Sequence, residues 1–119
     1  MNEELSTIGG SEVRRWLDQA KVLADTVAQL GKDLNVHDLA TPEVGEGAFE
    51  ALRAQVLPIL EARQRQGQHA LGVVLYRVDV PEAHAKRSMA AGGLPELSAQ
   101  VVLRCLQKVL TRMRFAGLA

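Results

Sequence analysis

The stretch from residue 94 to residue 115, LPELSAQVVLRCLQKVLTRMRF, decides how this chain is expected to fold. Its apolar residues recur every three or four positions, the spacing of one face of an α-helix. A narrow polar strip remains, in which Arg104, Lys108 and Arg112 follow one another at intervals of four residues. We therefore predict a helix with a broad apolar arc and one basic ridge, formed by these three cations.

Upstream, two longer segments also carry a helical stripe of apolar residues. Residues 12–34 are expected to form one helix, because Ser11 can cap its first N–H groups and the stripe continues to the end. Residues 47–66 show the same pattern, but Pro58 lacks an N–H and clashes with the preceding turn. We expect a kink or a break at that proline.

Residues 68–80 are the ambiguous part of the sequence. Leu71, Val74, Leu75 and Val78 have helical spacing, whereas alternate residues from Val74 onward also suit a strand. A lone strand has no evident partner for its backbone groups. We therefore favour a buried helix here, with a strand over residues 70–80 as the alternative.

A short helix over residues 82–91 is expected next. The sequence Asp79-Val80-Pro81-Glu82 resembles a capping box, in which the aspartate caps the new helix and the glutamate reaches back. Gly92-Gly93 should end this helix before residue 94.

Together these segments predict an all-α fold, a compact bundle of four to five helices, with α+β as the alternative if residues 70–80 form a strand. We expect one helical domain over residues 11–119, preceded by a flexible segment at residues 1–10. A chain of 119 residues, 47% of them hydrophobic, suits a single domain.

Location is predicted from what the sequence lacks. No run approaches the roughly 20 apolar residues that cross a bilayer, and the opening residues include Glu3 and Glu4 in place of a cationic, apolar signal. A cytoplasmic protein without membrane contact is expected. The single cysteine, Cys105, stands in an apolar run and is interpreted as a buried small hydrophobe.

Charge is unevenly distributed along the chain. Residues 1–60 carry ten acidic and five basic side chains, a net charge of −5, and residues 61–119 carry four and nine, a net charge of +5. Pairing within the fold or between copies would explain this asymmetry, and so would a nucleic-acid surface. The candidate anion contacts are Arg104, Lys108, Arg112 and Arg114, whose alternative interpretation is a solvated helix face.

Catalytic signatures are absent from the sequence. His37, His69 and His84 are scattered, without the paired carboxylates that metal sites in bundles use, and no nucleophile motif or phosphate loop occurs. We predict no catalytic residue, metal or cofactor, which favours a protein that is not an enzyme. The candidate ligand pocket is Tyr76, Arg77 and Asp79, polar groups in an apolar run, whose alternative is a packing ion pair.

The apolar arc leads to the functional hypothesis. Either the other helices cover it or a second copy does, as in common symmetric dimers. The sequence thus favours a helical protein-interaction module, a homodimer or the binder of a protein partner. Its candidate interaction surface is Leu103, Leu106, Leu110 and Met113. A nucleic-acid-associated protein and a small-ligand-binding protein or enzyme are the alternatives.

Two phrases carry a resemblance. Leu75-Tyr76-Arg77-Val78-Asp79 with Pro81-Glu82, followed by Gln107-Lys108-Val109-Leu110 and Arg112, resembles a set of small uncharacterised bacterial helical proteins. The resemblance covers the second half of the chain. It implies a helical fold and no known activity.

Overall fold

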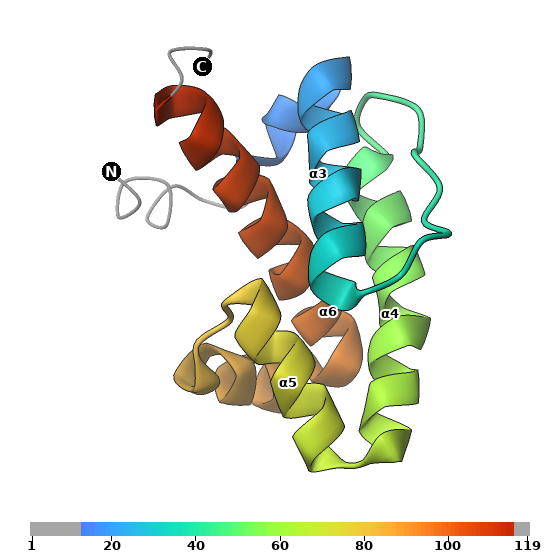
Figure 1. Cartoon of the computed structure of the whole chain (residues 1–119), viewed down its shortest axis with the longest axis vertical. Helices are drawn as coiled ribbons and strands as arrows, with labels where there is room; N and C mark the ends of the chain where they lie inside the picture. Colours follow the sequence, from blue (N-terminus) through green and yellow to red (C-terminus); the bar gives the residue numbers. More distant parts are fainter. Residues whose placement is uncertain (1–12, 116–119) are drawn as a thin grey trace.

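The computed structural model (Figure 1) describes residues 13–115, and every regular element in that part of the chain is helical. A 3-10 helix precedes four α-helices: η1 Arg15–Asp18, α3 Ala20–Leu34, α4 Ala48–Gln66, α5 Gln68–Val78 and α6 Glu82–Phe115. The fold is the all-α bundle that the hydrophobic spacing predicts. None of the described helices combines the length and apolar character needed to cross a bilayer.

The last helix, α6, is bent into two arms. Its backbone leaves the helical conformation at Gly93, with φ 72° and ψ −155°, a region that only glycine adopts readily. We call residues 82–92 the short arm and residues 94–115 the long arm. In Figure 1 the long arm runs diagonally up to the C-terminal end, and the short arm lies at lower left. The expected break at Gly92-Gly93 is confirmed.

The long arm is the central helix of the bundle, with α3 and α4 packed against it. Its apolar arc is covered by the chain's own helices, so the arc forms the middle of the hydrophobic core. The buried residues of the arc are Leu97, Val101, Val102, Cys105, Leu106, Val109, Leu110 and Met113.

The first predicted helix is interrupted, contrary to expectation. Residues 12–34 were expected to be continuous, but the chain forms η1, turns at Gln19 (φ −99°, ψ 123°) and only then starts α3. The N–H of Gln19 donates to the carbonyl of Trp16 at 3.1 Å and closes this tight turn. The turn lets Leu17 and Val22 both be buried. Ser11 and the segment 1–10 lie outside the described residues.

Pro58 does not break α4, which runs without interruption to Gln66. Both Pro58 and Ala54, whose carbonyl loses its donor, belong to exposed positions of the helix. Water can therefore satisfy the carbonyl, which removes part of the cost that predicts a break. The helix ends where Gly67 adopts φ 125°.

Residues 68–78 form a helix, so the strand alternative is wrong. The helix is buried on one face only, through Val74 and Val78. It ends at Asp79, whose left-handed backbone (φ 74°) lets the N–H groups of Asp79 and Val80 bond back to the carbonyl of Leu75, each at 2.9 Å.

The predicted capping box does not form as expected. Asp79 terminates α5, and its carboxylate binds Arg104 in the long arm at 2.8 Å. The first turn of α6 is closed by the N–H of Ala85, which donates to the carbonyl of Pro81 at 3.0 Å. The Asp79 carboxylate, which the local sequence pattern predicts as a helix cap, forms an ion pair with Arg104 instead.

The connection between α3 and α4, residues 36–47, has no helical turn at residues 41–43. One side chain holds its middle. The Gln55 amide accepts from the N–H of Ala40 at 2.8 Å and donates to the Ala40 carbonyl at 2.9 Å. The Gln55 side chain thus bonds both backbone groups of Ala40, as a neighbouring β-strand would do in a sheet.

Candidate interaction surfaces

The basic ridge of the long arm faces other helices of the same chain. Lys108 Nζ lies 2.8 Å from Asp33 Oδ2 on α3 and donates to the Arg77 carbonyl at 3.1 Å. Arg104 binds Asp79 twice, through Nη2 to Oδ2 at 2.8 Å and through Nε to the backbone oxygen at 3.1 Å. The Lys108 and Arg104 side chains are only 21% and 26% exposed. Both cations therefore bind carboxylates of the same chain. A helix face that only contacts water would not have such partners.

Gln29 extends these contacts towards the end of the long arm. Its amide accepts from Arg112 Nη1 at 2.6 Å and donates to Asp33 Oδ1 at 3.0 Å. We call Gln29, Asp33, Lys108 and Arg112 the polar seam, since they join α3 to α6 in one line. Arg112 and Arg114 are themselves exposed.

Asp33 is the centre of the polar seam. Its side chain is 8% exposed, and it accepts from Lys108, Gln29 and the Cys105 thiol, the last at a Sγ–O distance of 3.6 Å. Burial raises the pKa of the Cys105 thiol, and the negative charge of Asp33 raises it further. The thiol therefore stays protonated and donates, in agreement with the predicted buried, unreactive cysteine.

Arginines of the basic second half also cover the C-terminal end of α3. Arg77 Nη2 donates to the Lys32 carbonyl at 3.2 Å, and Arg63 Nη2 donates to the Leu34 carbonyl at 3.4 Å. Cations at this end of a helix meet the negative pole of its dipole. Together with the polar seam, these contacts show that basic side chains of the second half of the sequence bind groups of the first half within the same molecule. Part of the charge asymmetry is therefore used inside the fold.

Most of the predicted apolar interaction surface lies in the core. Leu106, Leu110 and Met113 are 0%, 3% and 8% exposed, because α3 and α4 pack over them. Leu103, in contrast, lines a surface hollow. An exposed apolar surface must therefore be sought on another element.

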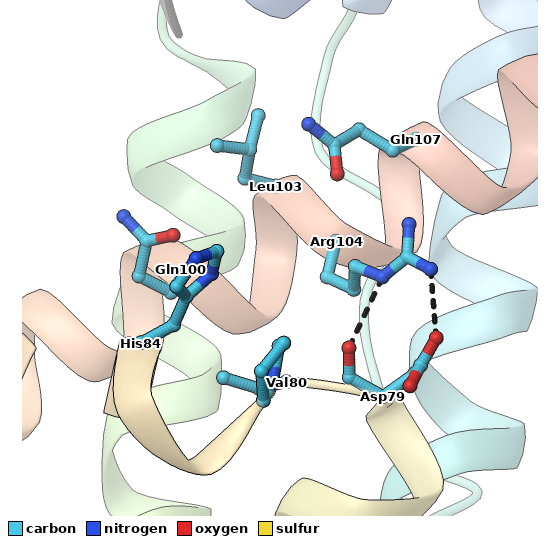
Figure 2. A pocket seen from close by; sticks show the side chains of 8 residues that line it. Asp79, Val80, His84, Gln100, Leu103, Arg104 and Gln107 are labelled. Carbon is cyan, nitrogen blue, oxygen red and sulfur yellow. Dashed lines mark hydrogen bonds and ion pairs between the residues drawn. The ribbon is translucent and has the colours of Figure 1, made fainter. Parts of the chain in front are cut away.

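The hollow at Leu103 lies between the two arms of α6 and has a volume of about 250 Å3. Figure 2 shows His84 of the short arm beside Gln100 of the long arm, with Leu103 and Gln107 further along. Arg104 closes one side through its bonds to Asp79. The lining includes the amides of Gln100 and Gln107 and the imidazole of His84, close to Leu103. The charge of Arg104 is neutralised by its ion pair with Asp79.

Sequence reasoning did not find this hollow. Gln100, Leu103, Arg104 and Gln107 have the spacing of one helix face, which was a usable signal. The approach of His84 depends on the fold of α6 at Gly93, which no local pattern describes.

The predicted pocket of Tyr76, Arg77 and Asp79 is not assembled around one space. The Tyr76 side chain is 85% exposed, the Arg77 guanidinium lies on the α3 carbonyl of Lys32, and Asp79 is paired with Arg104. Arg77 thus has a carbonyl partner where a carboxylate was expected. A hollow of about 360 Å3 lies beside Arg77, and Tyr76 and Asp79 are not among its lining residues.

The outer face of α5 carries the exposed apolar side chains that the long arm lacks. We define this face as Gln68, His69, Gly72, Val73 and Tyr76, which line an open depression of about 480 Å3. Val73 is 43% exposed and Tyr76 is 85% exposed. A Cβ atom added at Gly72 would meet no atom within 4 Å. In Figure 1, α5 is the foremost helix and no described element is drawn over it.

The histidines lie on three separate elements: His37 in the loop before α4, His69 on α5 and His84 on the short arm. Within residues 13–115, no three side chains among His, Cys, Asp and Glu gather closely enough to hold a metal ion.

Comparisons of the chain with protein-family models, with curated proteins and with solved structures gave no match.

Proposed function

We propose that this chain is a protein-interaction module that binds through the outer face of α5, and that it is not an enzyme. The supporting observation is the exposure of Tyr76, the only tyrosine of the chain, next to Val73. Tyrosine supplies a large contact area with few rotatable bonds and is enriched where interfaces hold their binding energy. The proposal keeps the cytoplasmic location expected from the sequence.

The shape of the face also supports this proposal. Gly72 leaves a gap between the helical positions of His69 and Tyr76, so a partner side chain can approach the backbone there. The face carries no aspartate, glutamate, lysine or arginine. Depletion of charge at the centre of a patch is typical of protein interfaces.

The nucleic-acid alternative has less support. Lys108 and Arg104 each engage a carboxylate of the same chain, and Arg112 engages an amide. Binding phosphates through these side chains would require breaking contacts within the fold.

Affinity capture from an extract of the native cells tests the proposal. We expect the wild-type chain to retain specific proteins that a Val73→Ser/Tyr76→Ser variant loses. A Val44→Ser/Met89→Ser variant is the matched control, because its target side chains are 49% and 37% exposed on other elements. Far-ultraviolet circular dichroism should show equal helicity in all three proteins.

Two results would contradict the proposal. Equal capture by wild type and the α5 variant would mean that the outer face of α5 is not the binding surface. Loss of capture with the control variant but not with the α5 variant would move the surface to the short arm or to the α3–α4 loop.

A further inference from the structure

We propose that the hollow at the C-terminal end of α3 is a binding site for a small monocarboxylate with an apolar body. The hollow has a volume of about 360 Å3 and is lined by residues from the ends of α3 and α4 and from α5. Figure 1 shows the C-terminal end of α3 between α4 and α5. The site is separate from the outer face of α5, although Val73 borders both.

Two arginines from different helices meet at this hollow. Arg63 of α4 donates through Nη2 to the Leu34 carbonyl. Arg77 of α5 donates through Nη2 to the Lys32 carbonyl. Both carbonyls belong to the last turn of α3, so the two guanidiniums lie at the same end of one helix. Guanidiniums match the planar geometry of a carboxylate, which accepts from their paired N–H groups.

Both arginines keep donors for a ligand. Their Nη2 atoms lie 3.4 Å and 3.2 Å from the helix carbonyls, whereas strong charge-assisted bonds are shorter, at about 2.7–2.9 Å. Each guanidinium has further N–H groups, and within residues 13–115 neither is paired with a carboxylate. Arg104 and Lys108, in contrast, each bind an aspartate at 2.8 Å. A bound carboxylate would supply the counter-ion that Arg63 and Arg77 lack.

The charge of the lining favours a ligand with one negative charge. Arg63 and Arg77 bring two positive charges and Asp33 one negative charge, which leaves a net charge of +1. The Asp33 carboxylate is engaged by Lys108 at 2.8 Å and accepts from Gln29. A ligand with two negative charges, such as phosphate, would leave excess negative charge beside Asp33 and the negative pole of α3.

The rest of the lining fits an apolar group. Leu34 and Val74 are 1% and 4% exposed and belong to the core, and Ala70 and Val73 also line the hollow. Small-molecule sites combine such apolar walls with a few polar groups that fix the orientation, and their volumes are about 300–1,000 Å3. The volume here is at the lower end of that range, so the apolar body is a short alkyl chain.

Isovalerate, a branched alkyl monocarboxylate, is the probe, and isovaleramide is its uncharged counterpart of nearly the same shape. We expect isovalerate to shift the backbone amide NMR signals of residues 34–36, 66 and 73–74, with a dissociation constant of about 1 mM. Isovaleramide lacks the charge, acetate lacks the alkyl group and inorganic phosphate lacks both matches. Each should bind at least about tenfold more weakly.

Variants of the two arginines test the assignment. Arg63→Gln and Arg77→Gln should each weaken isovalerate binding at least about tenfold, because each removes one guanidinium. Arg63→Lys keeps the charge but loses the planar fork, and it should weaken binding too. Arg87→Gln is the matched control, since it removes an exposed cation of the short arm outside the hollow and should leave binding unchanged. Far-ultraviolet circular dichroism should show equal helicity in all variants.

Absence of NMR shifts around the hollow at up to about 20 mM isovalerate would overturn the inference. Equal binding of isovaleramide, or undiminished binding by both glutamine variants, would overturn it as well. Equal binding of acetate or phosphate would show a general anion contact and no site for an apolar monocarboxylate. None of these results affects protein capture through Val73 and Tyr76, so the proposed function is tested separately.

Discussion

The two arms of α6 belong to one helical run but are held by different means. The long arm buries large side chains, including Leu97 and Leu106, and adds the polar seam. The short arm buries only Ala85 and Ser88, two of the smallest side chains. Its ion pair, Glu82 with Lys86 at 3.6 Å, is exposed.

This difference shows that helix formation and helix anchoring are separate properties. Both arms are good helix formers, yet the hydrophobic stabilisation of each scales with the apolar area that it removes from water. The short arm should therefore open locally, whereas the long arm should open only when the whole domain unfolds.

The largest expected effect concerns side-chain volume in the two arms. Leu106→Ala leaves a cavity at a fully buried position and should lower the free energy of unfolding by about 4 kcal/mol. Met89→Ala, at a 37% exposed position of the short arm, should change it by less than about 0.5 kcal/mol. Urea denaturation measures both, and equal losses would abolish the distinction between the arms.

The next effect concerns the ion pairs. Asp33→Ala removes the carboxylate that faces Lys108, which is mostly buried, and should destabilise the fold by about 3 kcal/mol. Glu82→Ala removes the exposed partner of Lys86 and should leave the thermal midpoint unchanged. A neutral outcome for Asp33→Ala would mean that the polar seam adds nothing to the anchoring of the long arm.

The boundary between the arms is the third point. Gly93→Ala forces a side chain into a backbone conformation that alanine avoids, and it should cost about 2 kcal/mol. Gly72→Ala, at an open helical position, should instead stabilise the monomer by about 0.7 kcal/mol. Thermal denaturation of the two variants should show shifts of opposite sign; a harmless Gly93→Ala would place the bend elsewhere.

The smallest effect is a pH dependence inside the long arm. The Cys105 thiol has a raised pKa in the folded chain, so above its ordinary value of 9.0 only the unfolded chain loses the proton readily. Stability should therefore fall as the pH rises beyond that value, by up to about 1.4 kcal/mol per pH unit. Urea midpoints at about pH 8 and about pH 10 should drop more for wild type than for Cys105→Ala. Parallel drops would indicate that the thiol is not desolvated.

Hydrophobic spacing predicted the helical class and the long arm well, because both depend on apolar positions within one segment. The breaks were harder to predict. Gly93 was identified because glycine marks a turn locally, whereas the turn at Gln19 lies in an unbroken stripe and forms so that both flanks reach the same core. The effect of Pro58 on the helix was overestimated, because its exposed position lets water bond the carbonyl that loses its N–H donor.

The surface was the part that local patterns described least. The basic ridge was correctly recognised as one face, but its partners Asp33 and Asp79 lie 75 and 25 residues away in the sequence. The tertiary packing determines such partners, so the four-residue spacing of the basic side chains does not predict them. Tyr76 shows the same limit, because its apolar neighbours suggested burial while the one-sided packing of α5 leaves it in solvent.

The amide clasp of Gln55 on Ala40 has a practical consequence for opening the chain. It holds the α3–α4 loop at Ala40, and the exposed backbone that follows can be cut. Cutting after Val44 yields one fragment with eight acids and four bases and another with six acids and ten bases. Their net charges of −4 and +4 favour mutual recognition, which suits a split reporter reassembled from two separately expressed pieces.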